Sequence, residues 1–254
     1  MSNNRLFSET EETGGEDKAT RASLVANDLR NRIMIGALAP EAHLRVQELC
    51  ARYDVALSPV REALNRLSSE GIVEARDMRG FFVAPVSETD LDELTRTRCW
   101  LNETAVRQSM ANNGITKNGM TKNGMTKNGA AWEERVLIAY HRLSRLDRRD
   151  ADGMASMAWN DAHRAFHRAL TDGCGSRHLI GYCDQLFVQA ERYRNLSRKA
   201  PSASPSLRDD EHRAIMEAAL AGDADRTVNL LNTHFERTAE LCRKVLRGKG
   251  NMNA

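Results

Sequence analysis

Four histidines in the second half of the chain have the spacing and surroundings of metal ligands. All four fall on the apolar faces of segments with helical periodicity: His163, His167, His212 and His234. His163 and His167 are four residues apart, so one helix face presents two ring nitrogens to the same point. A single buried histidine is more often a satisfied core residue than a ligand. Four together favour a divalent metal site, because imidazole binds zinc, nickel, copper and iron.

The elements that must position these histidines are helices. Beyond Pro85 no segment has a strand pattern, and apolar residues recur with helical spacing as far as Arg247. This pattern predicts an all-helical bundle of about six helices. Two loops interrupt it, one at residues 112–130 with a tandem repeat rich in Lys, Asn and Gly, and one at residues 200–206 with Pro and Ser. We expect the repeat to form an expanded loop, and the sequence does not define its role.

The first part of the chain has a different pattern. It predicts three helices followed by two short strands, at residues 24–34, 46–53, 58–69, 72–75 and 80–84. Ser58 is expected to cap the third helix and Pro59 to stand in its first turn. The expected fold is therefore mainly α, with a winged helix-turn-helix at about residues 46–65 and its β-wing, followed by the helical bundle.

Composition limits the classes of protein further. The chain has 254 residues and a net charge of +2, so it holds one or two domains, and any nucleic-acid contact must come from a local patch. No apolar run is long enough to span a membrane, and the first residues are polar and acidic, unlike a secretory signal. Five scattered cysteines without a CxxC pair indicate reduced thiols. We expect a cytoplasmic protein without a membrane partner.

Short motifs of the first part resemble the GntR-type winged helix of bacterial regulators. They are IGALAP, SPVREALNRL, EGIV and RGFFV, at residues 35–40, 58–67, 70–73 and 79–83. The resemblance implies binding to double-stranded operator DNA by a homodimer. It also implies the DNA-binding residues: Arg45, Gln47, Ser58, Arg61, Arg66, Arg79 and Gly80.

Each of these positions has an expected role. The third helix enters the major groove, where Ser58 can bond a phosphate or base edge and Arg61 can bond guanine. Arg45 and Gln47 resemble positions that touch the DNA backbone, and Arg79 with its following glycine resembles the tip of the wing. Arg61 could instead pair with nearby acidic residues, or contact a phosphate without reading sequence.

Motifs of the second part resemble the FCD effector domain of the FadR branch of the same family. They are WNDAHRAFH, EHRAI and AGDA, at residues 159–167, 211–215 and 221–224, followed by His234. In that family an aspartate and three histidines bind a divalent metal that helps to hold a small carboxylate. His163 stands where the family has the aspartate, although Asp161 lies nearby. This feature and the GCGS segment at residues 173–176 resemble the subgroup of glutarate-responsive repressors.

The replacement of the aspartate affects which metal we expect. Ligation by four nitrogens favours a borderline transition metal over magnesium or manganese, with zinc first and nickel second.

A small carboxylate effector needs a cation as its binding partner, and a buried arginine is the side chain best suited to this role. Arg98 is the leading candidate, because residues 98–102 (RCWLN) resemble an Arg-x-x-Leu-Glu segment of the family, with Asn102 in place of the glutamate. Residues 191–194 (ERYR) either offer further donors or form a solvated helix face. The expected effector-binding residues are Arg98, Asn102, Arg192, Tyr193 and Arg194.

The chain divides into segments with these expected roles. They are a tail at residues 1–20, a DNA-binding domain at 21–86, a linker at 87–90, an effector and dimerisation domain at 91–247, and a second tail at 248–254.

We therefore expect a transcriptional regulator, a repressor rather than an activator, whose operator binding responds to a small carboxylate at a metal site. One alternative is a regulator that senses the metal itself. A second is a metal-dependent hydrolase, which the sequence does not favour because it contains neither HExxH nor a nucleophile elbow. The identity of the effector and the operator cannot be deduced from the sequence.

Overall fold

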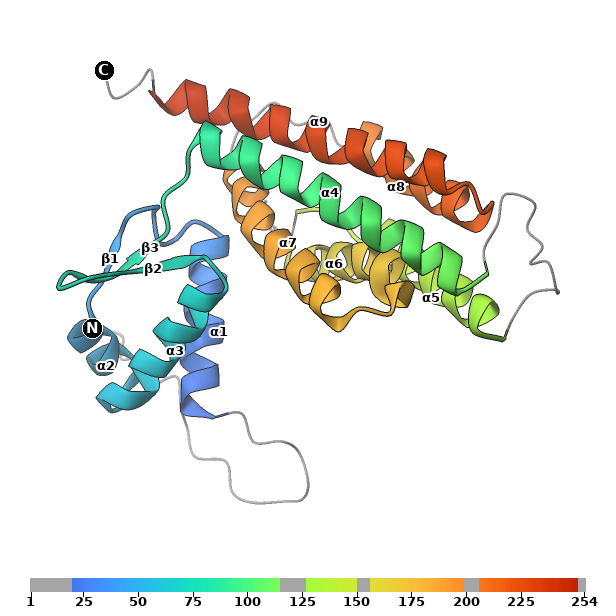
Figure 1. Ribbon diagram of the computed structural model, residues 1–254. Helices are drawn as coiled ribbons and strands as arrows, with labels where there is room; N and C mark the ends of the chain where they lie inside the picture. Colours follow the sequence, from blue (N-terminus) through green and yellow to red (C-terminus); the bar gives the residue numbers. More distant parts are fainter. Residues whose placement is uncertain (1–19, 115–126, 150–155, 199–205, 251–254) are drawn as a thin grey trace. The chain divides into compact units, whose positions relative to one another are not determined.

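The computed structural model describes residues 20–114, 127–149, 156–198 and 206–250. The chain separates into two compact units between Pro85 and Val86. Figure 1 shows a small sheet with helices α1 to α3 in the first unit, and a bundle of long helices, α4 to α9, in the second. The mainly helical fold with an N-terminal winged helix agrees with the prediction.

Three helices of the first unit share one apolar core. They are α1 (Arg21–Met34), α2 (Val46–Tyr53) and α3 (Leu57–Ser69). Leu29 and Ile33 of α1 and Leu64 of α3 are almost completely buried. The Thr20 hydroxyl caps α1 by accepting a hydrogen bond from the Ser23 backbone, which satisfies one of the free N–H groups of the first turn.

Three antiparallel strands form the wing. Their order in the sheet is β1 (His43–Leu44), β3 (Gly80–Val83) and β2 (Val73–Arg76). Arg76 lies opposite Gly80, so the two strands expected from the sequence are joined by a tight turn. Strand β1 was not predicted, because two residues are too few to show alternation. It forms by pairing with β3, where the ring of His43 stacks on Phe82 with the centroids 4.6 Å apart.

The start of α3 differs from the prediction. Ala56 is the N-cap and forms no side-chain hydrogen bond, so Ser58 lies inside the first turn and does not cap the helix. Pro59 fits there because the first backbone N–H groups of a helix have no intrahelical acceptor, and proline lacks this group. As a result, the hydroxyl of Ser58 is exposed and has no capping role.

The second unit is a helical bundle, as predicted. Its helices are α4 (Glu88–Asn112), α5 (Lys127–Ser144), α6 (Met157–Thr171), the 3-10 helix η1 (Asp172–Cys174), α7 (Arg177–Arg198), α8 (Ser206–Leu220) and α9 (Ala224–Gly250). The long helices α4 and α9 run side by side along the bundle (Figure 1).

Several boundaries differ from those expected. The linker at residues 87–90 is shorter, because Ser87 caps α4 by accepting the N–H of Asp90 at 3.0 Å and residues 88–90 are helical. Helix α5 begins at Lys127, before the end of the loop expected at 112–130, and α9 continues to Gly250, beyond the expected start of the tail. Residues 1–19, 115–126 and 199–205, which hold nearly all of the N-terminal tail, most of the repeat and most of the second loop, lie outside the described residues.

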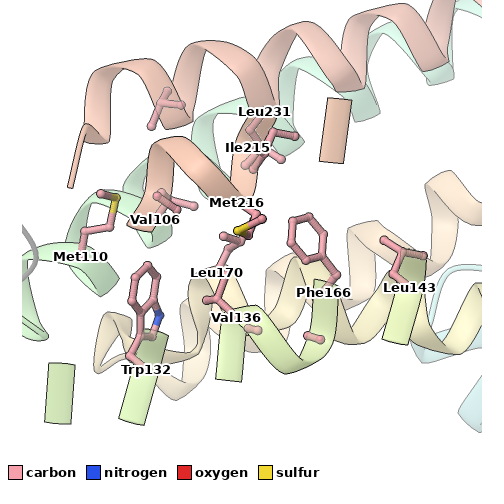
Figure 2. Close-up of a cluster of buried hydrophobic side chains, with 14 of the residues drawn as sticks. Val106, Met110, Trp132, Val136, Leu143, Phe166, Leu170, Ile215, Met216 and Leu231 are labelled. Atoms are coloured by element: carbon pink, nitrogen blue, oxygen red, sulfur yellow. The ribbon is translucent and has the colours of Figure 1, made fainter. Parts of the chain in front are cut away.

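One apolar cluster holds the bundle together. Figure 2 shows Trp132 and Val136 of α5 packed toward Phe166 of α6, with Ile215 of α8 and Leu231 of α9 above them. These side chains are at most 1% exposed, and burial of each large apolar side chain stabilises the fold by about 1.5–3 kcal/mol. Because the cluster joins α5, α6, α8 and α9, it fixes the faces of the three helices that carry the histidines.

The GCGS segment makes a close contact between η1 and the end of α4. The backbone N–H of Gly173 donates to the Ser109 hydroxyl at 3.1 Å, and its carbonyl accepts from the Asn112 side chain at 3.1 Å. A Cβ atom at Gly173 would lie 2.1 Å from the side-chain nitrogen of Asn113. Glycine is therefore required at this position by close packing, which holds the end of α6 against α4.

Candidate functional site

The four predicted metal ligands come together inside the bundle. His163 and His167 lie on α6, His212 on α8 and His234 on α9, and one ligand atom of each lies within 4.8 Å of those of the others. The four side chains are only 2–5% exposed. Phe166, which belongs to the apolar cluster, lies 5.5–5.6 Å from the rings of His167 and His212. The core of the bundle thus sets the positions of the histidines directly.

Hydrogen bonds fix the orientation of two of these rings. His163 and His167 approach each other through their Nε2 atoms at 3.1 Å, and Arg194 donates to Nδ1 of His163 at 3.1 Å. His234 is held by Glu211, whose carboxylate lies 2.8 Å from Nδ1. A neutral His234 that donates from Nδ1 keeps the lone pair of Nε2 for a metal, as in many carboxylate–histidine–metal sites.

The protonation states of these groups also favour metal binding. Burial lowers the pKa values of His163 and His167 well below the ordinary histidine value, and neighbouring positive charge adds to the effect. Burial also lowers the pKa of His234, although Glu211 opposes this shift. For Glu211, burial alone would raise the pKa, but the hydrogen bonds from His234 and Arg237 outweigh it and lower the pKa. The three rings are therefore neutral at pH 7, as metal ligands must be.

The cluster fits a tetrahedral transition metal. With zinc–nitrogen bonds of about 2.0–2.1 Å, the ligand nitrogens of such a site are roughly 3.3 Å apart. The Nε2 atoms of His163 and His167 are already 3.1 Å apart, and the most widely separated ligand atoms, up to 4.8 Å apart, would need to approach by up to about 1.5 Å. Asp161, which neighbours the family's aspartate position, is exposed and does not belong to the cluster.

Arg98 is a buried cation in a cleft next to the histidines. The cleft has about 270 Å³ of empty space, part of it open to solvent, and Arg98, Asn102 and His167 line it. The guanidinium of Arg98 lies 4.0 Å from the centre of the Phe235 ring, and its Nε has no hydrogen-bond partner.

This cation is available to an anionic ligand. No carboxylate among the described residues pairs with Arg98. Burial and the charge of Arg194 lower the pKa of Arg98 to about 10, so it is still a cation at neutral pH. A buried charge is costly unless it is paired, so a carboxylate from outside the chain would stabilise it. The side-chain amide of Asn102, which also lines the cleft, donates to the Arg98 carbonyl at 2.9 Å.

The predicted donors on α7 do not share this cleft. Arg192, Tyr193 and Arg194 are all buried, so this part of α7 is not a solvated helix face. None of the three lines the cleft with Arg98. Arg194 instead contacts His163 and pairs with Glu191 at 3.1 Å, and the Tyr193 hydroxyl bonds to the start of α4. Their role as effector-binding residues stays a prediction.

The predicted DNA-binding residues lie on the surface of the first unit. Ser58 and Arg61 are exposed in the first half of α3, and Arg61 forms no ion pair with any described residue. Arg79 and Gly80 are exposed at the turn of the wing, where Gly80 has a φ of 88°, a conformation that favours glycine. The intrahelical pairing considered for Arg61 is thus not found.

Two of the remaining candidates, Arg45 and Arg66, have protein partners. Arg45 pairs with Glu48 at 2.9 Å but is still largely exposed, as is Gln47. Arg66 lies 3.7 Å from Glu70, which also binds Arg30 of α1. Arg66 therefore helps to join α3 to α1 and is the candidate least available to DNA.

Sequence reasoning missed several residues of the site. Glu211 holds His234 but was quoted only as part of a motif, although an acidic residue beside a ligand is a usual partner of a metal-bound histidine. Arg164 and Arg168 line the cleft, and Arg168 pairs with Asp172 at 2.7 Å and also with Asp184. No signal in the sequence distinguishes these two arginines from others on exposed helix faces.

Two family models match the chain. The model described as "Bacterial regulatory proteins, gntR family" matches residues 21–83, and the model described as "FCD domain" matches residues 126–237. The first range corresponds to the winged helix, and the second contains all four clustered histidines.

Similar proteins are transcriptional regulators. The HTH-type transcriptional regulator BphR of Paraburkholderia xenovorans is 35% identical over 218 residues, which are 85% of this chain and 82% of BphR. The HTH-type transcriptional repressor GlaR of Escherichia coli is 31% identical over 223 residues, which are 87% of this chain and 94% of GlaR.

A solved structure of E. coli McbR/YncC has the same fold. The TM-score is 0.66 at 22% identity, and the match covers 89% of this chain and 98% of that one. In the part of the chain that is described, no helix is both long enough and apolar enough to span a bilayer.

Proposed function

The chain belongs to the GntR family of bacterial regulatory proteins and has an FCD effector domain, and we propose that it is a repressor whose operator binding is controlled by a small carboxylate at a transition-metal site. The observation that carries this proposal is the convergence of four buried histidines next to Arg98, a buried cation that no described carboxylate neutralises. The matched domains and the relatives are those of a DNA-binding regulator and not of an enzyme.

The DNA-binding role falls to exposed residues of the winged helix. Ser58 and Arg61 are exposed on the first part of α3, where they would reach the major groove. Because Arg61 forms no ion pair with a described residue, its guanidinium would be available to a guanine. Arg79 and Gly80 at the wing would contact a phosphate or the minor groove, and Arg45 with Gln47 the DNA backbone. Arg66 would contribute least, because it is close to Glu70.

The metal-binding role falls to the four histidines. A nitrogen-only set of neutral imidazoles favours zinc first and nickel second. A bound metal ion would cross-link α6, α8 and α9 and add positive charge next to Arg98. Arg98 and Asn102 would then orient the carboxylate in the cleft, with Arg164 and Arg168 at its walls.

A regulator that senses the metal itself is the second candidate. The observation in its favour is the donor set: four histidines can complete a tetrahedral shell, and closed shells of this kind are typical of structural sites. The orphan cation of Arg98 favours the carboxylate, because a metal sensor has no use for it. The two candidates differ in whether DNA release requires the metal to leave.

A homodimer would place two winged helices on successive turns of one DNA face, so we expect a short imperfect palindrome as operator. Light scattering should give twice the chain mass; a monomer that binds one half-site would contradict this. Such a regulator would act in the cytoplasm, in agreement with its five free cysteines.

The test uses an operator selected from random double-stranded DNA. Mono- and dicarboxylates of three to six carbons are screened by thermal shift, and each hit is added to the protein–DNA complex while bound metal is quantified. We expect one carboxylate to release DNA at constant metal content in the wild type and not in Arg98→Gln. Arg96→Gln, an exposed arginine of the same helix, is the control. Release only upon metal loss would favour the metal sensor, and no response to either would contradict both candidates.

A further inference from the structure

Two consecutive residues of α7 contact two different parts of the effector domain. Arg194 donates from its guanidinium to Nδ1 of His163 at 3.1 Å. Tyr193 accepts a hydrogen bond from the backbone N–H of Ser87 at 3.2 Å and donates one to the carboxylate of Asp90. Both side chains are buried, Tyr193 to 2% exposure. Helix α7 thus connects the histidine cluster to the first turn of α4.

The first turn of α4 is where the effector domain joins the winged helix. Strand β3 ends at Val83, and only residues 84–86 separate it from Ser87, the N-cap of α4. The start of α4 is therefore joined to the DNA-binding unit by only three residues. The Tyr193 hydroxyl holds both the Ser87 backbone and the side chain of Asp90 at this point.

We propose that Tyr193 is a positioning residue that transmits the state of the histidine cluster to the first turn of α4, and through it to the winged helix. This inference rests on the proposed function, because it requires the cluster to bind a metal ion. Burial and the Asp90 carboxylate raise the pKa of Tyr193, so its hydroxyl stays protonated and keeps both hydrogen bonds at physiological pH.

The link from the cluster to α7 follows from the chemistry of a histidine ring. A neutral imidazole has one protonated and one unprotonated nitrogen. In the structure Nδ1 of His163 accepts from Arg194, so the ring proton stands on Nε2, which faces His167. If His163 were to bind a metal through Nε2, its ring would carry the proton on Nδ1. Nδ1 would then be a donor facing the Arg194 donor, so this hydrogen bond would be lost, and Arg194 would move away from the ring together with the turn of α7 that also carries Tyr193.

Two other contacts hold the first turns of α4, but they are weaker candidates. Arg243 and Arg247 of α9 pair with Asp92 and Glu88 at 2.7 Å. Arg247, Asp92 and, in part, Arg243 are open to solvent, where salt screens ion pairs and their contribution is small. Tyr193 packs in an apolar cluster with Leu91 and Leu94 of α4, so its movement must displace the helix.

The test measures hydrogen exchange in residues 86–94 of the full chain, with and without Zn²⁺, and counts bound Zn²⁺. Tyr193→Phe removes only the hydroxyl, and Asp90→Ala removes its exposed acceptor without disturbing the core. Asp92→Ala is the matched control, because it removes a carboxylate of the same turn that pairs with α9. Zn²⁺ should change exchange several-fold in the wild type and in Asp92→Ala, and much less in the other two variants.

The outcomes separate this inference from the proposed function. A purely structural role of Tyr193 would alter exchange equally with and without Zn²⁺. The same Zn²⁺ response in all four proteins, or no response in a wild type that binds one equivalent, would overturn the inference and leave the metal site intact. If Tyr193→Phe does not fold, Asp90→Ala decides alone. A wild type that binds no Zn²⁺ would refute the proposed function and the inference together.

Discussion

The two units of the chain place their candidate functional residues in opposite environments. In the winged helix, Ser58, Arg61 and Arg79 are exposed and contribute nothing to the apolar core. In the effector domain the four histidines and Arg98 are at most 6% exposed and pack directly against the core. Function can change independently of folding in the first unit. In the second, ligand binding would be linked to folding, because the candidate ligand-binding groups are part of the buried core.

The linkage has a physical origin. Removing an exposed side chain changes stability by no more than about 0.5 kcal/mol in most cases. A buried polar group that loses its partner costs about 1–3 kcal/mol, and a ligand that binds only the folded state adds to stability in proportion to its affinity. The following predictions test this difference, from the largest expected effect to the smallest.

Replacement of one metal ligand should have the largest effect. His212→Ala removes a nitrogen from the centre of the cluster, so zinc affinity should fall by more than the roughly 100-fold that loss of a supporting residue can cost. Zinc should also no longer raise the melting temperature of this variant. Competition with a chromophoric chelator measures the affinity. His178→Ala, an exposed histidine of α7, is the control; equal affinity in both variants would mean that His212 is not a ligand.

Replacement of a DNA-reading residue should change DNA affinity without changing stability. Arg61→Ala should weaken binding to the cognate site by about 1–3 kcal/mol and relax its specificity. Its melting temperature should not change, because the side chain is exposed and unpaired. Arg79→Ala serves as comparison and should weaken all sequences more evenly. Fluorescence anisotropy with specific and nonspecific duplexes gives both ratios, and an unchanged ratio for Arg61→Ala would contradict base readout.

Replacement of Glu211, which forms a hydrogen bond with the candidate metal ligand His234, should have an intermediate effect on zinc affinity. In Glu211→Gln the charge that orients His234 and increases its basicity is lost, so zinc affinity should decrease about 10- to 100-fold. Glu217→Gln, an exposed glutamate of the same helix, is the matched control. Isothermal titration or chelator competition would measure both. If the two variants bind zinc equally well, Glu211 has no part in the metal site.

The smallest effect expected for a single residue is on the pH dependence of folding stability. His163, His167 and His234 have folded-state pKa values below the unfolded value of about 6.5, so the unfolded chain binds more protons in this range. Stability of the metal-free protein should therefore fall as the pH decreases below about 6.5, by roughly 1 kcal/mol per histidine over the first pH unit. Urea unfolding of wild type and His167→Gln measures this, and the variant should have the shallower pH dependence. Equal slopes would mean that His167 is not buried as a neutral ring.

Helical periodicity made the histidine cluster predictable. A helix places residues four apart on one face, and apolar neighbours show that this face points inward, which is enough to bring His163 and His167 together with ligands from other helices. Arg98 was predicted as a buried cation from the family resemblance of residues 98–102 and from the need of a carboxylate for a cationic partner. Local pattern and a specific family resemblance thus predicted the fold class and the histidines of the candidate metal site.

Features that depend on tertiary contacts could not be predicted. The ion pair between Glu70 and Arg30 of α1 joins residues 40 positions apart, which no local pattern indicates. Tyr193 and Arg194 are neighbours in a helix that is buried on several sides, so periodicity cannot tell which partner each one contacts. The two-residue strand β1 exists only because β3 lies beside it.

The metal content of the protein, purified without a histidine tag, tests the central claim most directly. Elemental analysis should find one transition-metal ion per chain, most often zinc, and a chelator should remove it and lower the melting temperature. Chelation should also weaken the response to the effector before it weakens DNA binding, because the winged helix has no ligand in the site. Less than a tenth of an equivalent of any transition metal, with none taken up on addition, would contradict the account and leave four histidines that serve only the core.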